Sequence, residues 1–119
     1  MFFITLSTFD QIINKKLLNR VNKLEQIFKK FSNDVSKYKY VEEIRVVGAQ
    51  AGIEFLNNKG LPNKKIVNDL VKSLLLKKII AYAGGEKGNV LMLIPPIIIK
   101  YDNLKRALKV IEEEISNLR

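Results

Sequence analysis

The chain has 119 residues, a length that suits one folded domain, and apolar residues make up 47% of it, as in folded proteins. It contains neither cysteine nor histidine, so disulfides, thiolate metal sites and Ser-His-Asp or Cys-His catalytic sites are excluded. We therefore expect residues 1–119 to form a single domain without a metal site.

No stretch approaches the ~20 consecutive apolar residues that a membrane-spanning helix needs. The run from Met1 to Leu6 is apolar, but it is short and lacks the basic flank and cleavage site of a secretory signal. We therefore expect a cytoplasmic protein with no membrane partner.

The formal net charge is +9 and the pI is about 9.8, a balance that can attract nucleic acid. The lysines are scattered between apolar helix positions and are not interleaved with an aromatic stacking motif. Solvated helix faces explain this pattern better than a nucleic-acid site. We do not expect nucleic acid as a partner, and we keep a basic nucleic-acid-binding module as an alternative function.

Two helices are expected at the start of the chain. Residues 5–14 predict a short helix with apolar residues on one side: Leu6, Phe9, Ile12 and Ile13. A longer helix should follow and stop near residues 32–34, because apolar residues recur there at steps of four and three: Leu17, Val21, Leu24, Phe28 and Phe31.

Residues 41–56 favour two strands, because Ile44, Val46 and Val47 are β-branched and Gly48 and Gly52 interrupt the run with a bend or bulge. The turn signal at residues 57–60 precedes a helix that opens at residue 62 or 63. Its buried face should consist of Ile66, Val67, Leu70, Val71, Leu74 and Leu75.

The remaining third alternates short strands with loops. Residues 79–83 predict a strand, residues 84–89 a glycine-rich loop, and the apolar residues 90–94 a strand covered on both faces. Pro95 and Pro96 end its pairing because neither has an N–H group, and residues 97–99 are expected to be extended. A last helix carries Leu104, Leu108, Ile111, Ile115 and Leu118. The fold class is α+β, with helices covering one side of a small, mainly antiparallel sheet.

Two groups of residues could carry chemistry. The loop from Gly84 to Gly88 could cradle a phosphate, but it lacks the P-loop spacing and precedes a strand, which favours a glycine-rich hairpin. The carboxylates of Glu42, Glu43 and Glu54 could serve acid–base catalysis, but nothing in their spacing pairs them in a cleft. We expect solvated charges at strand ends.

Two stretches are recognisable. Residues 44–55 read IRVVGAQAGIEF, and residues 84–99 read GGEKGNVLMLIPPIII before an amphipathic helix. Both resemble the C-terminal domain of class III pyridoxal-phosphate aminotransferases, the ornithine, acetylornithine and 4-aminobutyrate type, where the stretches read roughly V-R-G-x-G-L-M-x-G-I-E and G-x-x-G-N-V-I-R-x-x-P-P-L. The matching positions are Arg45, Gly48, Gly52, Glu54, Gly84, Gly85, Gly88, Asn89, Pro95 and Pro96.

The resemblance implies the small domain of fold-type I transferases, an antiparallel sheet covered by helices. In that family the large domain carries the lysine that binds pyridoxal phosphate and the aspartate that pairs with its ring nitrogen. Neither motif is present here, so no catalytic residue is assigned. The small domain of the family supplies an arginine that binds a substrate carboxylate or a nearby glutamate, and the matching residue here is Met92, which has no charge and no donor.

Other positions also depart from the family pattern. Val46 and Gln50 replace a glycine and a methionine, Lys78 stands where a glycine commonly ends the second helix, and Lys100 stands where Ser or Thr often caps the last one. A left-handed lysine and a missing cap each cost on the order of 1 kcal/mol.

The resemblance therefore predicts a 4-aminobutyrate aminotransferase-like C-terminal domain that does not transaminate alone. We expect the chain alone to bind no cofactor. Pyridoxal phosphate is expected only if a large domain is supplied. An alternative is the small subunit of a split aminotransferase, with a large-domain chain as partner and Met1 to Leu6 at the joint. We also expect a homo-oligomer, because the absent large domain leaves apolar surface exposed.

Overall fold

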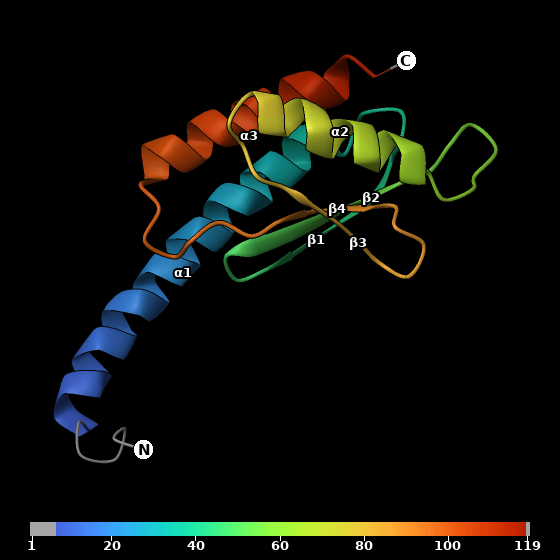
Figure 1. Ribbon diagram of the computed structural model, residues 1–119. Coiled ribbons are helices and arrows are strands. Elements are labelled where there is room, and N and C mark those ends of the chain that lie inside the picture. The colour runs from blue at the N-terminus through green and yellow to red at the C-terminus, as the bar shows by residue number, and fades with distance from the viewer. Residues whose placement is uncertain (1–6, 119) are drawn as a thin grey trace.

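The structure is a computed structural model that describes the backbone of residues 7–118 and the side chains of residues 15–118. It has three helices and four strands in the order α1 (Ser7–Val35), β1 (Val41–Val47), β2 (Gln50–Phe55), α2 (Lys64–Leu76), β3 (Tyr82–Gly84), β4 (Val90–Leu93) and α3 (Tyr101–Ser116). The strands form one antiparallel sheet in the order β1-β2-β4-β3 (Figure 1). The predicted α+β class is confirmed.

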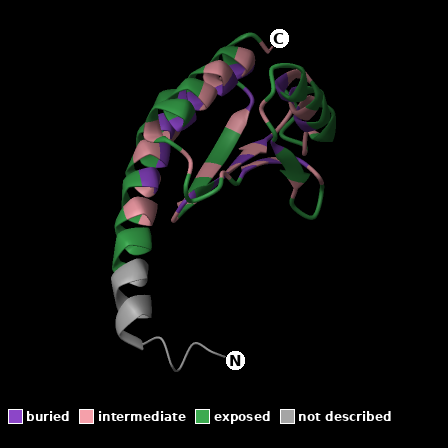
Figure 2. Cartoon of the chain, turned by 60° about the vertical axis from the view of Figure 1, so that its left-hand side comes forward, coloured by how far each residue is buried: buried purple, intermediate pink, exposed green. Residues whose placement is uncertain are grey.

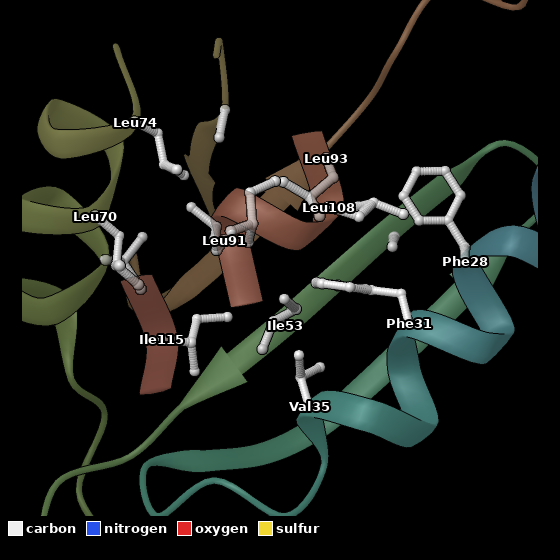
Figure 3. Packing of buried hydrophobic residues seen from close by; sticks show 14 of the residues in the cluster. Phe28, Phe31, Val35, Ile53, Leu70, Leu74, Leu91, Leu93, Leu108 and Ile115 are labelled. Atoms are coloured by element: carbon white, nitrogen blue, oxygen red, sulfur yellow. The ribbon is translucent and has the colours of Figure 1, made fainter. Parts of the chain in front are cut away.

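All three helices lie on the same side of the sheet (Figure 1). The buried core is therefore a single layer between the helices and one sheet face. Ile53 of β2 and Leu91 of β4 are paired in register and fully buried, and they meet side chains from all three helices (Figure 3). The helix residues of this core are Leu24, Phe28, Phe31, Val35, Val67, Leu70, Leu74, Leu104, Leu108, Ile111 and Ile115.

The helix α1 is continuous from Ser7 to Val35, so the prediction of a separate short helix over residues 5–14 is wrong. No glycine or proline lies between the two predicted segments, and nothing therefore stops the helix. Its second half packs on the sheet, whereas residues 15–19 are exposed and project beyond it (Figure 2). The predicted apolar face of Leu6, Phe9, Ile12 and Ile13 lies outside the described side chains.

The turn between β1 and β2 has two residues, Gly48 and Ala49, because Val47 pairs with Gln50. Gly48 has φ +57°, as the first residue of a type II′ hairpin requires. Its N–H donates to Oε2 of Glu25 on α1 at 2.9 Å, which fixes the hairpin end against the helix.

The helix α2 begins at the predicted place, with the Asn63 side chain accepting a hydrogen bond from the N–H of Ile66. It ends in a left-handed turn at Lys78, with φ +65°. The N–H of Ile79 donates to the carbonyl of Leu74, and that of Lys78 to the carbonyl of Leu75, both at 2.9 Å. This pair of bonds is a Schellman motif, which usually has glycine at the left-handed residue.

Three local predictions need correction. Leu75 is 60% exposed, because the buried face of α2 is narrower than the run of apolar residues suggests. The third strand begins at Tyr82 rather than residue 79, since the helix-ending turn uses the residues before it. Residues 97–98 form a turn, in which the N–H of Ile99 donates to the carbonyl of Pro96, and are not extended.

The strand β4 is covered on one face only, which also contradicts the prediction. Leu91 and Leu93 point into the core and are buried, whereas Val90 and Met92 alternate with them and are only partly covered. The reason is the single helix layer, because no described element covers the opposite face of the sheet. That open face carries residues from both recognisable stretches, among them Arg45, Gly52 and Met92.

Candidate functional site

The sheet face opposite the helices, here called the open face, carries one row of residues across all four strands. Arg45 of β1 pairs with Gly52 of β2, Gly52 with Met92 of β4, and Met92 with Tyr82 of β3. Because side chains alternate along a strand, these residues lie opposite the buried row of Ile53 and Leu91. The motif residues far apart in the sequence thus converge on one surface.

Met92 lies near the middle of this row and is partly covered. Its side chain leans across β3, where its sulfur fills the space that a β-carbon on Gly84 would occupy. A thioether offers no charge and only a weak acceptor. The position that the resemblance assigns to a carboxylate-binding arginine is therefore on the open face, but it presents an apolar surface.

The charged groups of the open face gather at the end of the sheet formed by Arg45, Glu43 and Glu54. Arg45 donates to Oε2 of Glu43 at 3.2 Å, and this hydrogen bond raises the pKa of the guanidinium. Glu43 pairs in register with Glu54 next to a β-bulge in β1. Glu42 also lies at this end and is exposed.

These residues line a shallow depression of about 720 Å³ together with the loop between β3 and β4. The structure thus brings Glu43 and Glu54 together, which their spacing in the sequence did not indicate. The side chain of Arg45 is 75% exposed and that of Glu43 is 50% exposed, so both remain in contact with water. An acid–base pair needs a desolvated cleft to shift its pKa values apart, and this depression does not provide one.

The loop from Gly84 to Gly88 is a hairpin connection, as predicted. Gly85 and Gly88 have φ of +83° and +65°, and the N–H of Gly88 donates to the carbonyl of Gly85 at 3.2 Å. The N–H of Gly88 is therefore engaged within the loop. The glycines are explained by the tight turn alone.

Asn89 has a structural role that the sequence did not reveal. Among the buried residues of the described chain, Asn89 is the one with a polar side chain. Its amide donates to the carbonyl of Phe55 at 3.0 Å. The N–H of Phe55 donates back to the carbonyl of Asn89 at 2.9 Å. This reciprocal pair fastens the end of β2 to the start of β4, which fixes the register of Gly52 and Met92.

A second unforeseen contact holds the segment after Pro95 and Pro96. Arg20 of α1 donates from Nε to the carbonyl of Ile97 at 2.9 Å and from its terminal nitrogen to the carbonyl of Ile99. The guanidinium also lies 4.8 Å from the ring centre of Tyr101, within the range of a cation–π contact. Periodicity places Arg20 off the apolar stripe and gives no sign of this role.

The described residues do not fit a site for a covalently held carbonyl cofactor. A lysine that forms a Schiff base needs a partly desolvated amine, and every lysine from Lys15 to Lys109 is exposed. Within residues 15–118 there is also no group of three or more carboxylates that could hold a metal ion. None of the helices in the described part is long and apolar enough to cross a membrane.

Comparison with known proteins places this arrangement in a family. The family described as aminotransferase class-III matches residues 2–115. The acetylornithine aminotransferase of Clostridium acetobutylicum is 25% identical over 114 residues, which are 94% of this chain and 27% of that enzyme.

Solved structures share the fold. A phospholyase from Arthrobacter in complex with phosphoethanolamine superposes with a TM-score of 0.82 at 19% identity, over 96% of this chain and 28% of the other. A Bacillus anthracis aminotransferase superposes with a TM-score of 0.79 at 19% identity, over 95% of this chain and 27% of the other. The chain thus spans about a quarter of the length of the relatives it matches. The match over residues 2–115 means that the chain belongs to the class III aminotransferases, a pyridoxal-phosphate-dependent family.

Proposed function

We propose that this chain forms the C-terminal small domain of a 4-aminobutyrate aminotransferase-like enzyme and cannot transaminate without a catalytic half. The observation that carries the proposal is its coverage, because it matches 27% of the acetylornithine enzyme while every described lysine is exposed. The amine that would hold pyridoxal phosphate must therefore come from elsewhere. This chain would contribute the open face to the active site.

The role of the open face follows from its chemistry. Met92 and Tyr82 offer apolar and phenolic surface at the centre of the sheet, while Arg45 is held by Glu43 at the β1 edge. A substrate group that contacts Met92 would meet no guanidinium there. We therefore expect an amine substrate without a carboxylate at the Met92 end to be preferred over a dicarboxylic amino acid.

The split-enzyme form of this proposal has support from the exposed apolar residues on and beside the open face. Val47 is 76% exposed and Tyr82 52% exposed, and residues of this size rarely gather on one surface of a monomer without a partner. A separate large-domain chain that covers this face, or a second copy of this chain, would bury them.

The proposal is tested by mixing this chain with a separately expressed catalytic half of a class III aminotransferase. Transaminase activity that requires both components supports it, whereas activity of the catalytic half that is unchanged by this chain contradicts it. The variant Met92→Arg refines the test, because the added guanidinium should lower KM for a dicarboxylic amino acid by about tenfold through a bidentate contact. The matched control Lys59→Arg, at an exposed position that does not line the depression, should leave KM unchanged.

Net charge alone supports the alternative of a nucleic-acid-binding module. The groove between α1 and α3 is lined by Lys23, Lys30, Lys105 and Lys109, but Asp34 and Glu112 lie in the same groove. A binding constant that falls steeply with salt would support this alternative. An absence of binding at low salt would remove it.

A further inference from the structure

A second surface feature lies at the other end of β4 from the charged depression. It is an open groove of about 860 Å³ between the end of α2, the side of α3 that carries Leu104 and Ala107, and the segment around Pro95 and Pro96. This volume is within the range of small-molecule sites. Its walls include Ile80, which is 68% exposed, and Ile94, which is 43% exposed. The groove therefore offers apolar surface that no described side chain covers.

The charge of this groove is of one sign. Lys77 and Lys78 line it from the end of α2 and Arg106 from α3, while no aspartate or glutamate lines it. Lys77 is paired with Glu114 at 3.0 Å, which offsets its charge. Lys78 and Arg106 form no ion pair within the described part of the chain. Two cations thus face an apolar groove from two different helices.

The backbone of Lys78 supplies an independent observation. Lys78 is the one non-glycine residue of the described chain with a positive φ, at a position where a Schellman motif favours glycine. A lysine in this conformation costs free energy that a glycine would not. Strained residues of this kind are concentrated at functional sites, where the side chain contributes something that the permissive residue lacks. Here the side chain contributes the amine at the rim of the groove.

From these three features we propose that the groove binds an anionic amphiphile, a hydrocarbon chain with a carboxylate or phosphate head. The hydrocarbon lies along Ile80, Ile94 and the apolar side of α3, and the head group lies between Lys78 and Arg106. A purely polar anion would leave the apolar walls in water, and a neutral hydrocarbon would leave both cations without a partner. This inference does not depend on the proposed aminotransferase role.

The test uses the 119-residue chain and three ten-carbon probes: decanoate and decyl phosphate below their critical micelle concentrations, and the neutral decanol below its solubility limit. Calorimetry measures affinity, and amide chemical shifts locate the probe. We expect saturable binding of decanoate and decyl phosphate, with shifts confined to residues 77–82, 94–99 and 103–110. Decanol should bind at least tenfold more weakly. The stronger of the two anions then identifies the head group.

The variants separate a binding role from a structural one. Lys78→Gly and Arg106→Gln should each lower the affinity for decanoate about threefold, as expected for the loss of one exposed ion pair, and should leave the affinity for decanol unchanged. Lys78→Gly should at the same time raise the melting temperature by about 4 °C, because it removes the left-handed lysine. Ile80→Ser should lower the affinity for both decanoate and decanol. The control Lys59→Gln, which removes the same charge in an exposed turn, should change neither affinity.

Several results would overturn the proposal. Equal affinity for decanol and decanoate would mean that the cations play no part. Unchanged decanoate binding in Lys78→Gly would mean that Lys78 only ends α2 and does not contact the ligand. Shifts centred on α1 or the open face would place the probe elsewhere, and binding to anionic vesicles without binding of monomeric decanoate would indicate a membrane surface instead.

Discussion

The sulfur of Met92 on β4 occupies the place where a β-carbon of Gly84 on β3 would lie. The two residues are on neighbouring strands, since Gly84 pairs with Val90 and Tyr82 with Met92. The glycine therefore makes room for the long side chain at the centre of the open face.

This relationship predicts a coupled pair of substitutions. Gly84→Ala alone should lower the free energy of unfolding by about 1 kcal/mol, because the new methyl group displaces the thioether. In a Met92→Ala background the same substitution should be neutral or slightly stabilising, since the obstacle is gone. Urea unfolding of the two single variants and the double variant gives the coupling energy. Simple additivity would show that the two side chains do not compete for this space.

The buried amide of Asn89 should be important for stability. Asn89→Ala removes the hydrogen bond to the carbonyl of Phe55 and should lower the free energy of unfolding by about 1–2 kcal/mol. Hydrogen exchange should also accelerate at the N–H of Phe55, which bonds to the carbonyl of Asn89. The control Asn68→Ala lies on an exposed position of α2 and should not destabilise the chain. An equal loss in both variants would contradict the role given to Asn89.

The end of α2 provides a stabilising substitution. Lys78→Gly should raise the free energy of unfolding by about 1 kcal/mol, because glycine adopts φ +65° without the steric conflict of a side chain. Lys78→Ala should bring no such gain, since alanine keeps the β-carbon. Lys72→Gly, at an exposed position inside α2, should destabilise by about 1 kcal/mol. Thermal unfolding of the three variants checks this order, and a loss of stability in Lys78→Gly would refute it.

The contact of Glu25 with the β1–β2 turn makes stability depend on acid pH. A hydrogen bond from Lys29 and one from the N–H of Gly48 lower the pKa of Glu25 below its usual 4.5. A carboxyl group with a lowered folded-state pKa stabilises the fold above its unfolded-state pKa, and this contribution is lost as pH falls through the folded-state value. Stability should therefore decline below about pH 4.5.

Glu25→Gln isolates this contribution, because the amide keeps an acceptor for Gly48 but does not titrate. Its free energy of unfolding should fall less between pH 6 and pH 3 than that of the unmodified chain. Glu113→Gln, at an exposed position on α3, is the matched control and should leave the slope unchanged. Identical slopes in all three proteins would mean that Glu25 has the same pKa in the folded and unfolded states.

Much of the fold could be predicted from local chemistry. The antiparallel pairing of β1 and β2 and the glycine hairpin before β4 follow from residues close in sequence, whereas the left-handed turn at Lys78 was expected from the family resemblance. Lys100 likewise begins α3 without a side-chain cap, as expected. At each of these positions one or two residues determine the backbone, and no distant contact is needed.

The predictions from sequence are wrong where contacts between residues far apart in the chain determine the local structure. The β-branched residues 97–99 suggest extended backbone, but Arg20, 77 residues away from Ile97, holds this segment through its carbonyls. The contact of Asn89 with Phe55 spans 34 residues. The apolar run of β4 suggests a strand that is covered on both faces. A sequence shows which residues are hydrophobic, but it does not show which face of the strand the helices cover. The alternation of buried and open residues appears only when the helices are placed.

The same limit applies to the candidate site. Resemblance identified Met92 as the residue in place of an arginine, and the strand register places it on the open face. The grouping of Arg45, Glu43 and Glu54 around one depression depends on the pairing of β1 with β2 and was not predicted.

The proposal that this chain does not catalyse transamination by itself can be tested by spectroscopy with added pyridoxal phosphate. The purified chain is titrated with pyridoxal phosphate, absorbance is recorded, and turnover of 4-aminobutyrate and of ornithine is measured in the same samples. Because every described lysine is exposed, we expect the spectrum of free cofactor and no turnover. A stable absorption band from lysine-bound cofactor, together with turnover by the chain alone, would contradict it.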